Sequence, residues 1–271
     1  MIRVAPREPR VIPAASVGLY ASAASAKLDF GSASNLDDVN PYTSAVLFYY
    51  RASNAGKQTP ELFMKGEFPN RNSMYFDSGA GDNFSIGGYV DRATTDSTAL
   101  AVANTFALGR WYLAIMTYDN TDGIRLYVGA IGNPIAEVSY ASRTVGAGAK
   151  NSDASYSVWI GGRNNTNGSQ CDYAFAAFWS GMLTLKQMRE LQAWLSPEMI
   201  RVGPPPASLK GGCRLWTFPG AHGYNKYIDW SGFGNHGAPS GSEIRLAKPA
   251  PSLLFQYQRS TKKPPLVVAI G

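Results

Sequence analysis

The sequence predicts an all-β protein, built as a two-sheet antiparallel sandwich with one short late helix and extended N- and C-terminal arms. Three observations point to this fold class. About ten short strand-like segments follow one another closely, as they do in two-sheet sandwiches. The 271 residues include 28 Gly, 17 Pro and 15 Tyr, a mixture that suits tight turns and pleated surfaces. Charged residues make up only 16% of the chain, whereas 45% of the residues are hydrophobic and can fill a core.

The strand-like segments are apolar or aromatic runs separated by clusters of Asn, Gly, Asp and Pro. In chain order they are 28–30, 45–51, 61–65, 73–76, 84–90, 111–118, 124–128, 134–140, 156–161 and 173–179. The run at 45–51 (AVLFYYR) is almost continuously apolar, which predicts a strand buried on both faces. The clearest hairpin joins 111–118 to 124–128, because Asp122-Gly123 supplies the positive φ that such a turn needs.

One helix interrupts the strands. Thr184 can cap a helix over 185–195, in which Met188 and Leu191 fall on the same face. Pro197 ends it, because proline cannot continue a helix. We expect this short amphipathic helix to lie across one edge of a sheet or to lead into the C-terminal tail.

The two ends of the chain differ from its middle. Residues 1–16 are predicted to form an extended arm, because their three prolines exclude helix. Residues 1–200 carry 16 Lys+Arg against 17 Asp+Glu, whereas 201–271 carry 9 against 2. The C-terminal extension is therefore basic, and it is expected to pack on the same or a neighbouring sandwich. Nucleic acid is the least favoured partner for it, because no aromatic-basic platform accompanies the charge.

The sequence carries no sign of export or of membrane insertion. The N-terminal segment lacks the apolar core of a signal peptide, and no run of about 18 apolar residues could cross a membrane. The chain has two cysteines, Cys171 and Cys213. Buried free thiols fit a chain without a secretory signal, but the sequence leaves a disulfide between them open.

Four segments resemble, in the same order, the laminin-G-like and concanavalin A-like jelly rolls. The most specific is 109–129, where GRWY, TYD and IRLYVG are similar to the family's G-x-W-Y-H-V-A-x-T-Y-D…x-R-L-Y-V-N-G. The others are 28–51, 61–66 and 159–191, and Leu113 stands where the family has His. The resemblance implies a jelly-roll sandwich over residues 17–200.

A fifth segment of the family's pattern is out of place. Residues 214–218 and 229–237 resemble the family's L-W-x-F…D-x-S-G-x-G-N-H-G, which normally precedes the jelly roll but follows it here. Our hypothesis is that 213–237 returns to pack on the same sandwich, as in a circular permutation, or on a neighbouring subunit.

The sequence lacks the residues of a known catalytic site, and we expect no enzymatic activity. Glucanases of the resembling fold carry an E-x-D-x-x-E motif, whose spacing puts two carboxylates on one face of a strand. None of the glutamates here begins such a motif. A G-x-S-x-G nucleophile elbow is also missing, and both histidines, His222 and His236, fall in the Gly/Pro-rich stretch 220–240.

Calcium is the candidate cofactor. Asp119, Asn120 and Asp122 place hard oxygen ligands on a single hairpin turn. The alternative is an ordinary polar turn, because Asp and Asn are common in turns for backbone reasons alone.

The first functional hypothesis is a structural or accessory protein of a virus particle, such as a bacteriophage capsid decoration, tail or fibre component. The resemblance implies it in part, because laminin-G-like domains without signal peptides occur in phage virion genes. Pro-rich arms and an apolar final segment suit assembly by strand addition with other copies or neighbouring virion proteins, which places the protein in the virion after assembly in the host cytoplasm. The predicted assembly residues are Arg3, Arg7, Arg10, Leu253, Phe255, Tyr257, Lys262, Lys263, Leu266, Val267 and Val268.

The second hypothesis is a carbohydrate-binding module or adhesin. Concanavalin A-like sandwiches often stack aromatic rings on sugars, which makes glycans candidate partners. Tyr89, Tyr140, Trp159 and Tyr173 are the candidate platforms. The alternative for each ring is a place in the core, since a sandwich needs aromatic residues there.

Overall fold

The computed structural model confirms the predicted two-sheet antiparallel sandwich. Two sheets of eight strands lie face to face over the residues that it describes. Those residues are 10–12, 19–21, 27–50, 61–77, 85–103, 106–107, 109–130, 133–162, 171–195, 200–219, 228–240 and 244–246.

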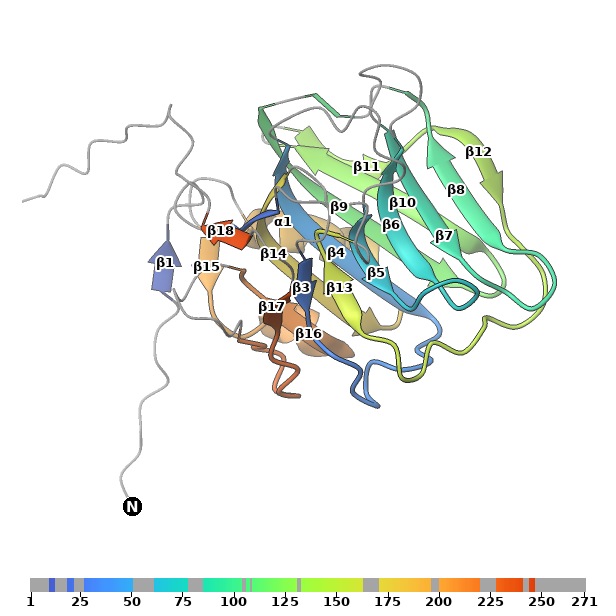
Figure 1. Ribbon diagram of the computed structural model, residues 1–271. Coiled ribbons are helices and arrows are strands. Elements are labelled where there is room, and N and C mark those ends of the chain that lie inside the picture. The colour runs from blue at the N-terminus through green and yellow to red at the C-terminus, as the bar shows by residue number, and fades with distance from the viewer. Residues whose placement is uncertain are drawn as a thin grey trace, which may run out of the picture.

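The sheet nearer the viewer in Figure 1 is called the front sheet, with the strand order β12-β8-β7-β6-β5-β13-β3-β17. In that order its strands are β12 (Tyr140–Thr144), β8 (Ser97–Ala101), β7 (Ser85–Val90), β6 (Asn72–Asp77), β5 (Glu61–Lys65), β13 (Val158–Ile160), β3 (Lys27–Asp29) and β17 (Ala238–Ser240).

The second sheet, called the back sheet, has the order β11-β10-β9-β4-β14-β2-β18, and β16 pairs with β14 beside β2. Its strands are β11 (Asn133–Glu137), β10 (Gly123–Ala130), β9 (Arg110–Asp119), β4 (Tyr42–Tyr50), β14 (Cys171–Ser180), β2 (Leu19–Ala21), β18 (Ile244–Leu246) and β16 (Cys213–Thr217). A separate two-stranded sheet pairs β1 (Arg10–Ile12) with β15 (Ile200–Val202).

The back sheet is buried on both faces, and β4 shows why its sequence is almost continuously apolar. Val46 and Phe48 point into the core between the two sheets. Ala45 and Leu47 point the other way, into a second core. A strand that must fill two cores cannot alternate apolar with polar residues, so the prediction for this segment is confirmed.

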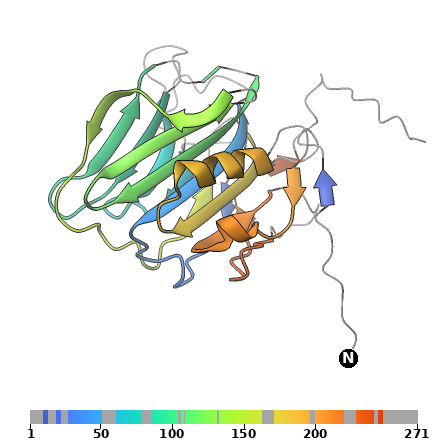
Figure 2. The ribbon, with the colours of Figure 1, turned by 180° about the vertical axis from the view of Figure 1, so that it is seen from behind.

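The second core lies beneath α1 (Leu185–Trp194), which crosses the outer face of the back sheet in Figure 2. The predicted cap is present as a capping box between Thr184 and Gln187. Met188 and Leu191 are the buried side chains of this helix. A four-residue helix that the sequence did not predict, α2 (Ala207–Lys210), inserts Leu209 into the same core.

The C-terminal segment returns to the sandwich. Strand β16 pairs antiparallel with β14, and β17 pairs with β3 at the edge of the front sheet. Trp216 is fully buried, and its indole N–H donates to the carbonyl of Gly203 at 2.9 Å. Residues after position 200 therefore supply strands to both sheets.

The strand register also places the two cysteines far apart. Cys171 lies opposite Tyr50, whereas Cys213 lies opposite Trp179, eight residues along β14. That spacing corresponds to roughly 26 Å, too far for a disulfide, and both cysteines are free and buried. None of the described helices is long and apolar enough to span a membrane.

One predicted strand is wrong in extent. The sequence suggested a single strand over 134–140, but β11 belongs to the back sheet and β12 to the front sheet. The chain changes sheets between Glu137 and Tyr140, so both neighbouring segments are strand-like without forming one strand. Strand β8, whose small residues gave no apolar signal, was not predicted.

Candidate functional site

Five side chains form a row across the outer side of the front sheet. Tyr89, Ser73, Met64, Trp159 and Asp29 pair directly across β7, β6, β5, β13 and β3. Their neighbours along these strands fill the core between the sheets, so the row faces outward. We call this outer side of the front sheet the front face. No described helix covers it, whereas α1 covers the far side of the molecule (Figures 1 and 2).

A third aromatic residue, Tyr75, lies on the same face. Tyr75 pairs with Gly87 on β7, and its ring covers that glycine: a Cβ at position 87 would lie 2.3 Å from Tyr75 Cζ. A side chain at position 87 would displace the ring, so the glycine fixes where the ring lies. On the other side Tyr75 pairs with Glu61 of β5.

Trp159 is held at one end of the row by its neighbours on β3. Its indole N–H donates to Asp29 Oδ2 at 3.1 Å, and Asp29 Oδ1 accepts the backbone N–H of Gly31 at 2.8 Å. Lys27 Nζ lies 3.4 Å from the centroid of the ring, a cation–π contact. Burial lowers the pKa of Lys27, although the carboxylates of Asp29 and Glu67 oppose the shift. Trp159 is consequently rigid and only 7% exposed.

Tyr89 is held at the other end of the row. Its hydroxyl donates to Asp96, and the guanidinium carbon of Arg71 lies 4.0 Å from the centroid of its ring. Arg71 Nη1 also lies 3.8 Å from Glu61 Oε1. Burial and the hydrogen bond to Asp96 raise the pKa of Tyr89 well above its ordinary value. The phenol is therefore neutral at every physiological pH.

Ser73 Oγ and Arg71 Nε are buried polar atoms on this face that have no hydrogen-bond partner within the part of the chain that the structure describes. Ser73 is fully buried and lies between Tyr89 and Met64 in the row. A buried donor or acceptor without a partner costs about 1–3 kcal/mol, so this point of the face can accept hydrogen bonds from, or donate them to, a ligand or water.

The other two predicted sugar platforms lie elsewhere. Tyr173 is fully buried in the core between the sheets, opposite Phe48 of β4, so no surface ligand reaches its ring. Tyr140 lies on β12 at the opposite edge of the front sheet, where its hydroxyl accepts the Leu126 N–H and donates to Glu137, both at 2.9 Å. The structure thus brings Tyr89 and Trp159 together on one face and leaves the other two out.

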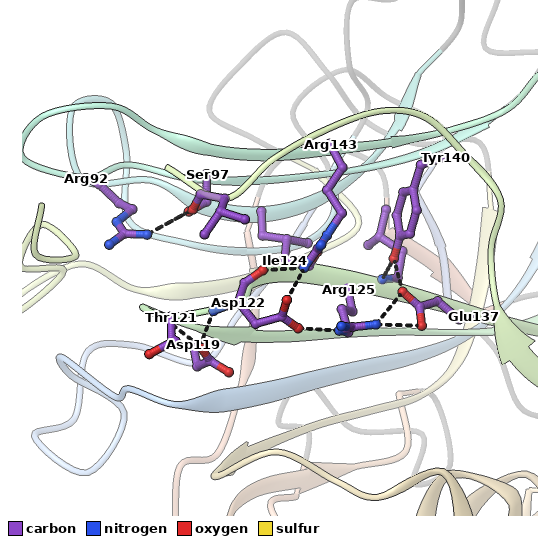
Figure 3. Close-up of polar contacts among 12 residues, drawn as sticks. Arg92, Ser97, Asp119, Thr121, Asp122, Ile124, Arg125, Glu137, Tyr140 and Arg143 are labelled. Atoms are coloured by element: carbon purple, nitrogen blue, oxygen red, sulfur yellow. Dashed lines mark hydrogen bonds and ion pairs between the residues drawn. The ribbon is translucent and has the colours of Figure 1, made fainter. Parts of the chain in front are cut away.

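The oxygens predicted to bind calcium are already engaged at the hairpin tip (Figure 3). Asp119 Oδ1 accepts the backbone N–H groups of Thr121 and Asp122, each at 2.6 Å, which closes the turn. Asn120 Oδ1 accepts the Tyr118 hydroxyl at 2.7 Å. Within the described residues no group of three His, Cys, Asp or Glu side chains is placed to hold a metal ion. Calcium binding at this turn stays a prediction.

Asp122 joins this turn to two arginines (Figure 3). Arg125 donates to its carboxylate, and Arg143 Nη2 lies 3.0 Å from its Oδ1. These hydrogen bonds, above all the one from Arg125, lower the pKa of Asp122 despite some burial. Arg125 also donates to Glu137, whose carboxylate accepts a hydrogen bond from the Tyr140 hydroxyl. The network ties β10 to β11 and β12 and is structural.

A second ionic cluster closes one end of the sandwich. Lys65, which is almost fully buried, donates to Asp37 Oδ1 at 2.6 Å and to the carbonyl of Tyr156 at 2.5 Å. Lys150 donates to Asp153 Oδ2 at 2.7 Å. The ammonium groups occupy the space among these oxygens, so the cluster joins two loops to the end of β5 and leaves its carboxylates occupied.

The predicted assembly residues lie almost entirely outside the described residues. Arg10 is the exception, and only its backbone is described, in β1 opposite Val202. The residues outside the described part are Arg3, Arg7, Leu253, Phe255, Tyr257, Lys262, Lys263, Leu266, Val267 and Val268.

The sequence did not reveal Tyr75, Arg71 or Glu61 as members of the front face. One signal was present, because Ser73, Tyr75 and Asp77 alternate with Asn72, Met74 and Phe76 along β6. That period of two separates the faces of one strand. It does not say which residues of other strands lie beside them, and that pairing defines the face.

Comparison with known proteins supports the fold. No family model and no curated protein matches the chain. A heptameric SAP-like pentraxin from Limulus polyphemus is 15% identical with a TM-score of 0.50, covering 88% of this chain and 99% of the pentraxin.

Two further solved structures are less similar. Mouse laminin alpha1 domains LG4-5 are 11% identical with a TM-score of 0.43, covering 67% of this chain and 46% of that one. The CBM40 domain of a Ruminococcus gnavus sialidase, bound to sialyllactose, is 10% identical with a TM-score of 0.37, covering 68% and 96%. Sialidase and arabinofuranosidase chains also occur among such structures. At these identities the likeness concerns the fold alone, which is a concanavalin A-like jelly-roll sandwich.

Proposed function

We propose that the protein is a glycan-binding module and that its ligand lies across the front face. The observation that supports this most is the row from Tyr89 to Trp159, with Tyr75 beside it, on the sheet surface that no described helix covers. The half-buried rings of Tyr75 and Tyr89 supply apolar area for the C–H faces of sugars, and the charged and hydroxyl groups beside them supply hydrogen bonds.

The site is already ordered before a ligand arrives. Asp29 orients the Trp159 indole, Asp96 orients the Tyr89 hydroxyl, and Gly87 seats the Tyr75 ring. Groups that are fixed in advance lose little conformational freedom on binding, which favours affinity.

We infer that the module binds without catalysis. Asp29 and Asp96 each accept a hydrogen bond from an aromatic partner of the row, and Glu61 lies beside Arg71. A retaining or inverting glycosidase needs two carboxyl groups facing one scissile bond, one of which gives or takes a proton. These carboxylates instead position neighbouring side chains.

A glycan array followed by titration calorimetry tests the proposal. Tyr89→Ala and Trp159→Ala are each expected to weaken binding at least about tenfold, since stacking of a ligand ring on an aromatic side chain contributes on the order of 1–3 kcal/mol. Tyr49→Ala is the matched control: it removes a half-buried ring, paired with Trp111, from the back sheet. Unchanged binding in both front-face variants would place the ligand elsewhere.

The role in a virus particle stays a prediction. It depends on terminal arms whose residues lie mostly outside the described part of the chain, and no observation on the sandwich favours it over glycan binding. Light scattering of the full chain would test it, since a discrete oligomer is expected of an assembling protein and a monomer is not.

A further inference from the structure

The front face carries an excess of carboxylates. Six acidic residues lie on or beside it in the described structure, against two cations, Lys27 and Arg71. The six are Asp29, Glu61, Glu67, Asp77, Asp91 and Asp96.

Each of the two cations is matched by neighbouring carboxylates. Arg71 Nη1 lies 3.8 Å from Glu61 Oε1. Lys27 lies over Trp159 within the field of Asp29 and Glu67. Among the described residues the face therefore carries more carboxylates than cations.

The carboxylates of the face act on Tyr75, beside the row, and on one another. Burial raises the pKa of Tyr75, and the charge of Asp77 raises it further. Burial also raises the pKa of Asp91, with Asp96 adding to the shift by repulsion. In both shifts burial is the largest cause, and a neighbouring carboxylate adds to it.

Ser73 shows that the face also has a polar position for a ligand to use. Its hydroxyl is fully buried and has no partner in the described structure, and Arg71 Nε beside it is in the same state. A sugar hydroxyl is both donor and acceptor, so it can bond Ser73 or Arg71 Nε and donate to a nearby carboxylate in one contact. A carboxylate or sulfate on a sugar can accept but cannot donate.

We propose that the front face selects neutral glycans and discriminates against carboxylated or sulfated ones. This inference rests on the proposed glycan-binding function and names its ligand class. The carboxylates of the face repel an incoming anion, which also loses hydration that the face does not replace. A neutral sugar, rich in hydroxyls, meets both hydrogen-bond donors and acceptors on the face.

The test uses an array on which each neutral oligosaccharide is printed beside its C6-oxidised counterpart, so that members of a pair differ only in the carboxylate. For each neutral sugar bound, we expect the oxidised partner to bind at least about tenfold more weakly at low salt. The difference should shrink as salt is raised toward 1 M, where the screening length is about 3 Å.

Charge reversal provides the matched comparison. Asp77→Lys, at a half-exposed position at the end of β6, should reduce the ratio of the affinities for the neutral and the oxidised sugar of each pair at least about threefold. Glu190→Lys makes the same change in net charge at an exposed position of α1, on the other side of the molecule. It should leave the ratio of the two affinities unchanged.

The outcomes separate the two proposals. Equal or tighter binding of the oxidised partners overturns the selection for neutral sugars and leaves glycan binding intact. An equal effect of both charge reversals also overturns it, because net charge rather than the front face would then be responsible. If no sugar of either kind binds, glycan binding itself fails, and the inference fails with it.

Discussion

A single buried carboxylate fixes the conformation of the C-terminal segment. Asp229 is 5% exposed and accepts four hydrogen bonds. They come from the Trp216 N–H at 3.0 Å, the Ser231 N–H at 2.9 Å, the Ser231 hydroxyl at 2.7 Å and the Asn235 N–H at 3.0 Å. One carboxylate thus fastens the loop 228–237 to β16, which explains the D-x-S-G-x-G-N-H-G pattern in physical terms.

Replacing this carboxylate should destabilise the fold strongly. Asp229→Ala leaves buried N–H groups without acceptors, and we expect the free energy of unfolding to fall by about 3 kcal/mol. Ser231→Ala, which removes one of the four donors, should cost about 1 kcal/mol. Urea unfolding of the three chains measures both values, and equal stability of Asp229→Ala and the wild type would contradict the assignment.

The buried thiol of Cys213 should make stability depend on alkaline pH. Burial raises the pKa of Cys213 to about 12. The folded state therefore holds the thiol proton more tightly than the unfolded state does. The resulting stability is complete below the unfolded pKa and is lost as pH rises toward the folded pKa.

Melting temperatures measured from pH 8 to pH 11 check this linkage. We expect the wild type to lose stability over this range more steeply than Cys213→Ala, in which the thiol is gone but the buried tyrosines remain. If the melting temperatures of the two chains fall in parallel as pH rises, the Cys213 thiol does not contribute to the alkaline loss of stability.

At the scale of the elements, α1 closes the core on the back sheet. Gln192 donates to the Asn133 carbonyl at 2.8 Å and accepts the Ile135 N–H at 2.7 Å, which ties the helix to β11. The helix begins with reciprocal hydrogen bonds between Thr184 and Gln187. Its position thus depends on its cap and on one glutamine as well as on its apolar face.

Loss of the cap should be measurable but tolerated. Thr184→Ala is expected to lower the free energy of unfolding by about 1 kcal/mol, since one backbone N–H of the first turn loses its acceptor. Thr184→Ser, which retains the hydroxyl, is the matched control and should stay within about 0.5 kcal/mol of the wild type. Chemical denaturation compares them, and identical losses in both variants would contradict a capping role.

The helix, the central hairpin and most strands could be predicted from the sequence because their signals are local. The Asp122-Gly123 turn and the cap at Thr184 are examples, since a few adjacent residues specify each. The front face could be predicted only in part. Tyr89 and Trp159 were recognised as aromatic candidates, but their alignment depends on the register of three successive strand pairings, and Tyr173 has the same local appearance while filling the core.

At the scale of the whole molecule, the sandwich does not end where the sequence changes character. We expected the jelly roll over 17–200 and, after it, a basic extension that packs on the same or a neighbouring sandwich. In the structure, β16 covers part of β14, and Trp216 and Phe218 fill the core outside the back sheet. Composition marked the boundary at the Pro-rich stretch, but strand pairing continues beyond it.

A chain that ends at residue 200 should therefore fail to form the native sandwich. It would expose Phe175 and Trp179, which are now 0% and 1% exposed, and would leave β14 without β16. We expect loss of the sharp thermal transition and binding of a hydrophobic dye. A chain ending at residue 246, which keeps all the described strands, is the control, and a cooperative transition in both chains would contradict this.

The central claim is that a glycan binds on the front face, and NMR perturbation mapping with a neutral sugar from the array tests it most directly. The indole N–H of Trp159, which donates to Asp29, is a reporter within the row and can be assigned from a Trp159→Phe spectrum. We expect shifts at Trp159 and in the backbone around Ser73 and Tyr89. Shifts confined to the back sheet around Tyr49, with the front face unchanged, would contradict the account.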